Sequence, residues 1–189
     1  MFGLKSNLQT EKRKRLRTLS ILIVLSTLGG SVSVLVGYTG RVVSSFSIFP
    51  FVAPQPLSGL HVFWLILAGV LVGTRGSATF VGGAKGLIET ILSSHLGPFS
   101  FVVSLTEGLV ADLVFALLKN NSTLSLYLAS GFSAASNLII IQLFLAPGYP
   151  LTVCVLAYSA SFVSGLLLSG CLTTKVVKAL PRNLLPGNE

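Results

Sequence analysis

Six long apolar segments constrain the fold of this chain more than any other feature of its sequence. They cover approximately residues 18–39, 57–73, 77–94, 98–118, 123–145 and 150–172. A helix needs about 20 apolar residues to cross a hydrocarbon core of about 30 Å, so each segment is close to the length of one crossing. The 189 residues are 52% hydrophobic and only 10% charged. We therefore predict an all-α membrane protein with six transmembrane helices.

Basic residues gather at both ends of the chain and indicate its orientation. Six precede the first apolar segment, namely Lys5, Lys12, Arg13, Lys14, Arg15 and Arg17. Three follow the last one, namely Lys175, Lys178 and Arg182. With Arg75 and Lys119 in turns on the same side, all of the 13 lysines and arginines except Arg41 and Lys85 share that side. Cytoplasmic loops carry such an excess, so both termini are predicted to be cytoplasmic.

This orientation divides the chain into three parts. Residues 1–17 form a basic cytoplasmic segment, residues 18–172 the six-helix transmembrane domain, and residues 173–189 a cytoplasmic tail. The formal net charge of +8 follows membrane topology and is not spread over a polar face with interleaved aromatic residues. We therefore expect a lipid bilayer around the protein and no nucleic acid as a partner.

Four acidic or basic residues other than histidine lie inside the predicted helices, namely Lys85, Glu89, Glu107 and Asp112. Each such group costs roughly 2.5–3.5 kcal/mol near the bilayer centre, whereas a Leu or Ile returns only about 0.3–0.6 kcal/mol. The four together predict a shielded polar interior. Lys85 and Glu89 are four residues apart on one helix face, so they either form a structural ion pair or bind a solute. For Asp112 we favour structural pairing over ligand contact.

Polar and aromatic residues at similar depth predict a pocket that opens to the outside. We expect its solute-binding residues to be His61, Trp64, Glu89, Glu107, Asn137 and Tyr158. Such a lining suits a small, partly aromatic solute that is cationic or rich in hydrogen bonds. The intramembrane formal charge of −2 favours a cation. Trp64 is equally compatible with a role as an interface anchor, as tryptophans at membrane surfaces often are.

The longest connection between apolar segments runs from about residue 40 to residue 57 and is rich in Phe and Pro. It is too apolar to extend into water. Two interpretations are open. The connection either packs on the helix ends, or it forms a lid over an outward-facing pocket.

Several kinds of chemistry are not indicated. The nearest string to a phosphate-binding loop is GGAKGL, which lacks the required pattern, and no HExxH or GxSxG motif occurs. Cys154 and Cys171 are separated by about 25 Å along one predicted helix and cannot pair. We predict a non-catalytic protein with no cofactor and no metal site, so ATP hydrolysis, if it drives transport, belongs to another subunit.

The stretch FWLILAGVLVGTRGSATFVGGAKGLIETILSSHLGPFSFVVSLTEGLVADLVFALL, about residues 63–118, resembles the YkoE-type S components of energy-coupling-factor (ECF) vitamin transporters. A Trp-containing helix ends at a basic turn with glycine, a small-residue helix carries GLIE, and the next helix ends as EGLVADLVFALL. The resemblance implies a six-helix S-component bundle that captures thiamine or its hydroxymethylpyrimidine moiety. It also implies a transmembrane T component and two cytoplasmic ATPases as partners.

The resemblance also suggests where partners and solute meet this chain. Glu89, Glu107 and Asp112 match acidic or amide positions of the family pattern, and Ser26 and Gly30 replace an Ala-x-x-x-Ala motif that contacts the T component. Two other functions stay open. One is a stand-alone proton-coupled carrier of a small cationic solute, with Glu107 or Asp112 changing protonation. The other is a membrane scaffold that transports nothing.

Overall fold

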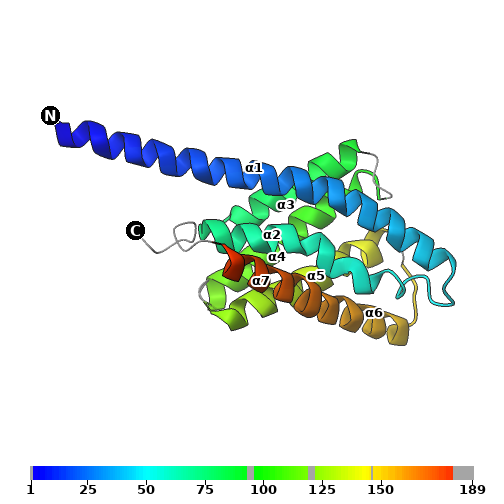
Figure 1. The fold of residues 1–189 in the computed structure, drawn as a ribbon. Helices are drawn as coiled ribbons and strands as arrows, with labels where there is room; N and C mark the ends of the chain where they lie inside the picture. The colour runs from blue at the N-terminus through cyan, green and yellow to red at the C-terminus, as the bar shows by residue number, and fades with distance from the viewer. Residues whose placement is uncertain (1, 93–95, 119–121, 146, 181–189) are drawn as a thin grey trace.

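A computed structural model shows an all-helical bundle, which confirms the predicted fold class (Figure 1). The structure describes residues 2–92, 96–118, 122–145 and 147–180. Its main helices are α1 (Phe2–Ser45), α2 (Ser58–Val72), α3 (Ser77–Ile91), α4 (Phe99–Leu118), α5 (Thr123–Ile140), α6 (Leu151–Ser164) and α7 (Cys171–Ala179). Lys119, Arg182 and most of the predicted tail lie outside the described residues.

Two helices are extended by π-helical turns, and a short 3-10 turn precedes α2. Segment η2 (Ile141–Leu145) continues α5, and η3 (Gly165–Gly170) joins α6 to α7 without a break. The 3-10 turn η1 (Gln55–Leu57) leads directly into α2. The chain after residue 172 is therefore still helical, so the predicted tail begins as a continuation of the last apolar segment.

The connection between α2 and α3 is tight because two glycines take a left-handed backbone. Gly73 has φ of 67° and Gly76 has φ of 89°, a region that L side chains rarely adopt. Gly73 closes α2 by donating its amide to Gly69 O at 3.0 Å. α3 therefore folds back antiparallel to α2 after a turn of four residues.

Five helical stretches are long and apolar enough to cross a membrane among the described residues. They are Glu11–Ser45, Gln55–Val72, Phe99–Leu118, Thr123–Leu145 and Leu151–Ala179. α3 has 15 residues and is too short to meet that standard. The N-terminal part of α1 and the end of α7 lie at the same end of the bundle (Figure 1). Six spans with cytoplasmic ends stay a prediction.

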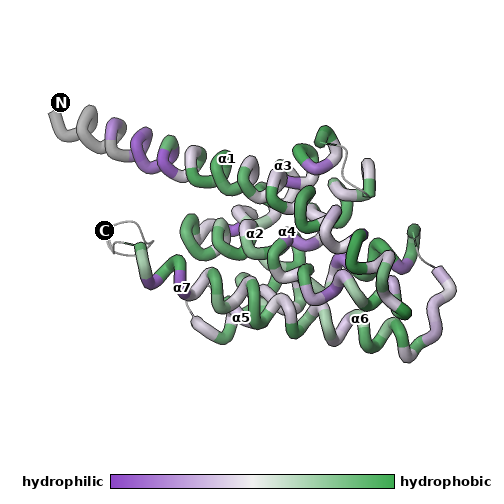
Figure 2. The backbone as a smooth tube through the Cα atoms, turned by 45° about the vertical axis from the view of Figure 1, so that its right-hand side comes forward, coloured by the Kyte–Doolittle hydropathy of each residue, from purple (hydrophilic) through white to green (hydrophobic). Residues whose placement is uncertain are grey.

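The main apolar core is formed by residues of α1, α2, α3, α4 and α5. Val62, Leu65 and Ile66 of α2 are fully buried, as are Ala78 and Val81 of α3 and Ala111 of α4. Many large apolar side chains remain exposed on the outer surfaces of the helices, where Figure 2 shows mostly hydrophobic segments. This distribution fits a protein whose surroundings are lipid.

Candidate solute-binding site

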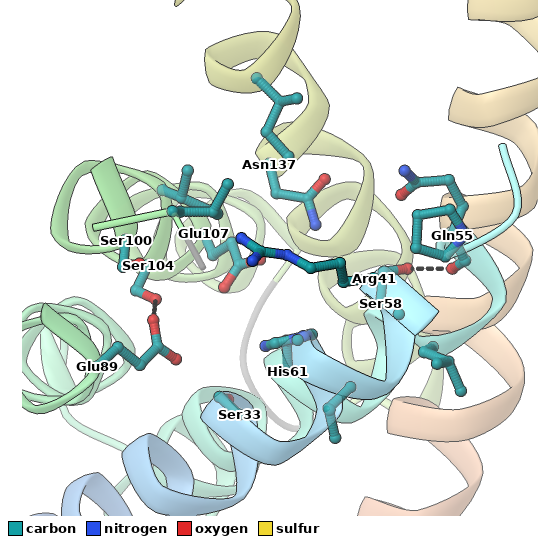
Figure 3. A pocket seen from close by; sticks show the side chains of 18 of the residues that line it. Ser33, Arg41, Gln55, Ser58, His61, Glu89, Ser100, Ser104, Glu107 and Asn137 are labelled. Atoms are coloured by element: carbon teal, nitrogen blue, oxygen red, sulfur yellow. Dashed lines mark hydrogen bonds between the residues drawn. The ribbon is translucent and has the colours of Figure 1, made fainter. Parts of the chain in front are cut away.

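A cavity of about 250 Å³ lies near the end of the bundle that carries the α1–α2 connection (Figure 3). Five helices contribute to its wall, so the site needs the folded bundle and is not formed by any local motif. Its polar lining residues are Ser33, Arg41, Ser44, Gln55, Ser58, His61, Lys85, Glu89, Ser100, Ser104, Glu107 and Asn137. Four predicted solute-binding residues are thus brought together, namely His61, Glu89, Glu107 and Asn137.

Lys85 forms the centre of a buried ion cluster on the cavity wall. Its Nζ lies 2.8 Å from Glu89 Oε1 and donates to Ser104 Oγ at 2.9 Å. Ser104 Oγ in turn donates to Glu89 Oε2 at 2.9 Å. The Lys85 side chain is 1% exposed. Glu89 is therefore ion-paired through Oε1 and hydrogen-bonded through Oε2, while Oε1 has no hydrogen bond of good geometry among the described residues. The ion pair predicted as one of two possibilities is present.

Glu107 is held less completely than Glu89. Its Oε2 lies 3.6 Å from Lys85 Nζ, beyond hydrogen-bonding distance, although the carboxylate is buried. Figure 3 shows the Arg41 side chain reaching across the cavity toward Glu107. Glu107 therefore lines the cavity with one oxygen, Oε2, that has no hydrogen-bond partner within the described residues.

Unsatisfied acceptors gather at this cavity. Ser33 Oγ, Glu107 Oε2 and Asn137 Oδ1 are buried and have no hydrogen-bond partner within the described part of the chain. They come from α1, α4 and α5, and all three residues line the cavity. Buried polar groups are normally hydrogen-bonded, because leaving one unpaired costs about 1–3 kcal/mol. Their convergence on one hollow is chemically suited to a solute that donates N–H or O–H groups.

The charge of the cavity differs from the prediction. Asp112 does not line it, whereas Arg41 does. With His61 neutral, Arg41 and Lys85 balance Glu89 and Glu107. The argument that an excess of two negative charges favours a cation is therefore wrong, because it counted Asp112 and left Arg41 in the outer loop. What remains is a site whose formal charges balance and whose lining includes buried acceptors without hydrogen-bond partners among the described residues.

Trp64 lies one helical turn beyond His61, outside the residues that line the cavity. Its ring packs against Gly29, where a Cβ atom would stand 2.9 Å from Trp64 Cγ, and contacts Phe63 edge to face at 5.1 Å. Its Nε1 is buried with no hydrogen-bond partner among the described residues. Direct solute contact by Trp64 stays a prediction, and the observed role is packing of α2 against α1.

Tyr158 also lies away from the cavity. It lines an apolar groove between α4, α5 and α6 on the surface of the bundle. Its hydroxyl donates to Gln142 Oε1 at 3.1 Å. Solute contact by Tyr158 stays a prediction that would require rearrangement.

Asp112 binds the beginning of α3. Its Oδ2 accepts hydrogen bonds from Thr79 N at 2.7 Å and Thr79 Oγ1 at 2.6 Å, and Oδ1 accepts one from Ala78 N at 3.4 Å. The first amides of a helix have no partner within it, and their partial positive charge favours a carboxylate. This arrangement agrees with the structural interpretation that we favoured for Asp112.

Ser26 and Gly30, the predicted contacts for the T component, face the inside of the bundle. Ser26 is 2% exposed and donates to Leu22 O at 2.7 Å. At Gly30 an added Cβ would stand 2.7 Å from Ile88 Cγ2, so α1 packs on α3 at this point. In this structure the two residues join α1 to the bundle, and contact with a partner through them stays a prediction.

The α1–α2 connection packs on the bundle and borders the cavity. Phe51 is buried and stacks on Tyr149 with ring centroids 4.6 Å apart, which joins two connections at the same end. Gln55 Nε2 donates to Phe51 O at 2.9 Å, and Ser164 Oγ donates to Pro56 O at 2.6 Å. Pro54 and Gln55 line the cavity. The packing interpretation therefore holds for this structure, and movement of the connection as a lid stays a prediction.

Sequence reasoning missed several polar lining residues, including Ser33, Arg41, Gln55 and Ser104. Ser33 and Ser104 lie in apolar helices that contain many serines, so their type alone gave no signal. Arg41 offered a usable one, because it is the only lysine or arginine predicted to lie on the outer side. A lone basic residue at the mouth of an acidic pocket could have been assigned to its lining.

Three comparisons with known proteins bear on the site. A family model described as "ABC-type cobalt transport system, permease component" matches residues 17–137. A Bacillus subtilis (strain 168) protein, provisionally named HMP/thiamine permease protein YkoE, is 25% identical over an alignment of 176 positions. The alignment covers 89% of this chain and 85% of the relative. A solved S component of an ECF transporter matches with a TM-score of 0.75 at 23% identity, covering 86% of this chain and 83% of that chain.

Proposed function

Because this chain belongs to the family of ABC-type cobalt transport system permease components and has the fold of an ECF S component, we propose that it is the solute-binding subunit of an ATP-driven ECF importer. It is a multi-pass protein of the cell membrane. In the proposed arrangement it crosses the membrane six times, with both ends in the cytoplasm and the cavity open to the outside.

The convergence of Ser33 Oγ, Glu107 Oε2 and Asn137 Oδ1 on the cavity carries this proposal. A membrane scaffold would gain nothing from a hollow lined with unsatisfied acceptors, since each lowers stability. A solute with several N–H or O–H donors would satisfy them on binding. The volume of about 250 Å³ is slightly below the usual range for drug-sized ligands, so the solute is small.

Hydroxymethylpyrimidine or thiamine is the solute class that fits best. The printed name of the Bacillus relative refers to HMP and thiamine. An aminopyrimidine carries an exocyclic amino group that can donate to Glu107 and Asn137, and its flat ring fits a narrow space between helices. Its ring nitrogens can accept from the Arg41 or His61 side chains that line the same cavity.

A metal ion as cargo fits the described site less well, despite the description of the family. Within the described residues, no group of three or more His, Cys, Asp or Glu could hold a metal ion. The acidic groups of the cavity surround the ammonium of Lys85, which would repel a cation at that position. We therefore propose an organic solute.

The proposed partners follow from the S-component fold. A T component in the membrane and two cytoplasmic ATPases would supply the free energy of transport, and this chain would catalyse nothing. Solute binding would occur at the cavity before the loaded subunit meets the T component. This order of events predicts that the isolated subunit binds its solute without ATP.

Calorimetric titration of the detergent-purified protein tests the proposal. Thiamine, hydroxymethylpyrimidine and a panel of other vitamins would be titrated into the wild type and into Asn137→Ala. We expect tight binding of one pyrimidine compound and at least tenfold weaker binding in the variant, because the free acceptor is removed. Ser136→Ala is the matched control, since Ser136 is the adjacent residue, is 4% exposed, and does not line the cavity.

A folded wild type that binds none of these compounds would contradict solute capture. Binding that is equally strong in Asn137→Ala would leave solute capture standing and contradict the assignment of the cavity. Uptake that collapses with a protonophore while cellular ATP is constant would point instead to the proton-coupled carrier.

A further inference from the structure

The basic residues at the start of α1 form a collar of charge around one helix. Lys12, Arg13, Lys14, Arg15 and Arg17 lie within two turns, and all five side chains are exposed. Successive residues of an α-helix are turned by about 100°, so these five point to every side of α1. We name these five residues the basic collar.

The collar lies outside the bundle but on the same continuous helix. α1 runs unbroken from Phe2 to Ser45, and its first buried residue that the structure describes is Leu22. In Figure 1 this part of α1 extends beyond the other helices, and Figure 2 shows it as a hydrophilic stretch next to a hydrophobic one. The collar therefore has open surroundings on all sides rather than one face turned to the protein.

The length of the adjacent apolar stretch sets the depth of the collar in the membrane. Residues 18–38 follow it and rise about 31 Å as a helix, which matches a hydrocarbon core of about 30 Å. The exposed apolar side chains Leu16 and Leu19 lie at the boundary. The basic side chains of the collar thus lie at the level of the phospholipid headgroups.

Other charges at the same end of the molecule have the same sign. Arg75 lies in the α2–α3 turn, and Lys175 and Lys178 lie on α7. Glu11 is the only acidic residue of the described chain that adjoins the collar. Headgroups that carry negative charge are attracted to such a cluster, and the attraction falls off within about a Debye length.

We propose that the basic collar binds anionic phospholipid headgroups and prefers them to zwitterionic ones. The all-round placement favours lipid over an acidic protein surface, because a protein would meet one face of the helix whereas headgroups surround it. The inference does not depend on the identity of the solute or on the proposed function.

Lipid quenching of an added tryptophan tests the proposal. Leu16→Trp places a reporter within the collar at a side chain that is 63% exposed. The full-length protein would be placed in nanodiscs of mixed phosphatidylglycerol and phosphatidylcholine, with bromine on the chains of one lipid or the other. The fluorescence of the natural tryptophan, Trp64, is measured on the protein without the added tryptophan and is subtracted. Leu35→Trp is the matched control, because Leu35 is 67% exposed on the same helix but far from the collar.

We expect brominated phosphatidylglycerol to quench the Leu16→Trp reporter at least twofold more than brominated phosphatidylcholine does. For the Leu35→Trp reporter, we expect the two brominated lipids to quench equally. The preference should fall as salt is raised. It should also disappear when all five collar residues are replaced by Gln, a change outside the packed core that should leave the bundle folded.

Equal quenching by the two lipids at Leu16→Trp would overturn the proposal, and so would a preference that persists in the variant with five glutamines. Native mass spectrometry of the wild type released from the same nanodiscs gives a second measurement that needs no substitution. Retained phosphatidylglycerol in excess of its share supports the proposal. Retention of both lipids in proportion to their abundance contradicts it.

Discussion

The contact between α3 and α4 has two halves that use polar residues in opposite ways. In the half next to the α2–α3 turn, Gly108 lies against the backbone of Ala78, and Asp112 is hydrogen-bonded to Thr79. In the half next to the cavity, Lys85, Glu89 and Ser104 bond to one another while Glu107 keeps a free oxygen. We call these the turn half and the cavity half.

The difference shows how to separate structural from binding charges in a membrane bundle. Asp112 and Glu107 are five residues apart on one helix, and both are acidic residues in an apolar segment. Asp112 has hydrogen-bond partners for both of its carboxylate oxygens and does not line the cavity. Glu107 has one carboxylate oxygen without a hydrogen-bond partner among the described residues, and it lines the cavity. The charge alone does not distinguish Asp112 from Glu107, but the hydrogen bonds that each carboxylate accepts do.

Lys85→Met should have the largest effect on stability, in the cavity half. It removes the ammonium that lies 2.8 Å from Glu89 Oε1 and 3.6 Å from Glu107 Oε2, and breaking a buried ion pair from one side costs about 3–5 kcal/mol. Thermal unfolding of the detergent-purified protein would measure the loss. Lys85→Met with Glu89→Gln should recover part of it, because one uncompensated charge is removed. A single variant as stable as the wild type would show that the ion cluster is not structural.

Gly108→Val should have the next largest effect, in the turn half. A Cβ at Gly108 would stand 2.6 Å from Ala78 O, so α3 and α4 would have to separate. Overpacking of this kind costs about 1–3 kcal/mol, measured again by thermal unfolding. Gly83→Val is the matched control, since its Cβ would meet Leu105 Cδ1 at an ordinary 3.6 Å. Equal losses in the two variants would contradict the close packing of the turn half.

Glu107→Gln should weaken solute binding at least tenfold, which corresponds to about 1.4 kcal/mol of binding free energy. The amide has nearly the same shape, but it replaces one carboxylate acceptor with an N–H donor. Titration calorimetry with the solute found for the wild type would measure the change. Since Glu107 Oε2 is 3.6 Å from Lys85 Nζ, the variant should lose less stability than Lys85→Met. Unchanged affinity would remove Glu107 from the site.

Asp112→Asn should have the smallest effect of the four substitutions. In contrast to Glu107→Gln, it should lower stability and leave solute affinity unchanged. The first turn of α3 would lose a charged acceptor, and such losses at helix starts cost about 1 kcal/mol. Solute affinity should be unchanged, because Asp112 does not line the cavity. Parallel titration and thermal unfolding would check both parts. Weakened binding with unchanged stability would reverse the roles that we assign to the two halves.

The helices themselves could be predicted well from the sequence. Apolar segments of about 20 residues fix where helices can lie, since the backbone in lipid must satisfy its own hydrogen bonds. The charges within them indicated a polar interior, and the four-residue spacing of Lys85 and Glu89 gave their pairing as one of two possibilities. These inferences rest on local spacing along one helix, which the sequence contains directly.

The contacts between helices were less predictable. Helical rotation decides whether a residue such as Trp64 faces a cavity or a neighbouring glycine, and that rotation depends on the packing of all the helices together. Arg41 was assigned to a loop, but α1 extends to Ser45 and carries it to the cavity wall. The number of spans also depends on α3, whose 15 residues fall short of the usual length.

The shortness of α3 has a consequence for the surrounding bilayer. Its 15 residues rise about 22 Å, whereas the hydrocarbon core is about 30 Å thick. A span shorter than the core is accommodated by local thinning of the bilayer, at a modest cost for each ångström of mismatch. In the proposed orientation, Glu89 lies two residues from the outer end of this helix. The bilayer beside α3 would then be locally thinner, and a solute would travel a shorter distance from water to reach Glu89.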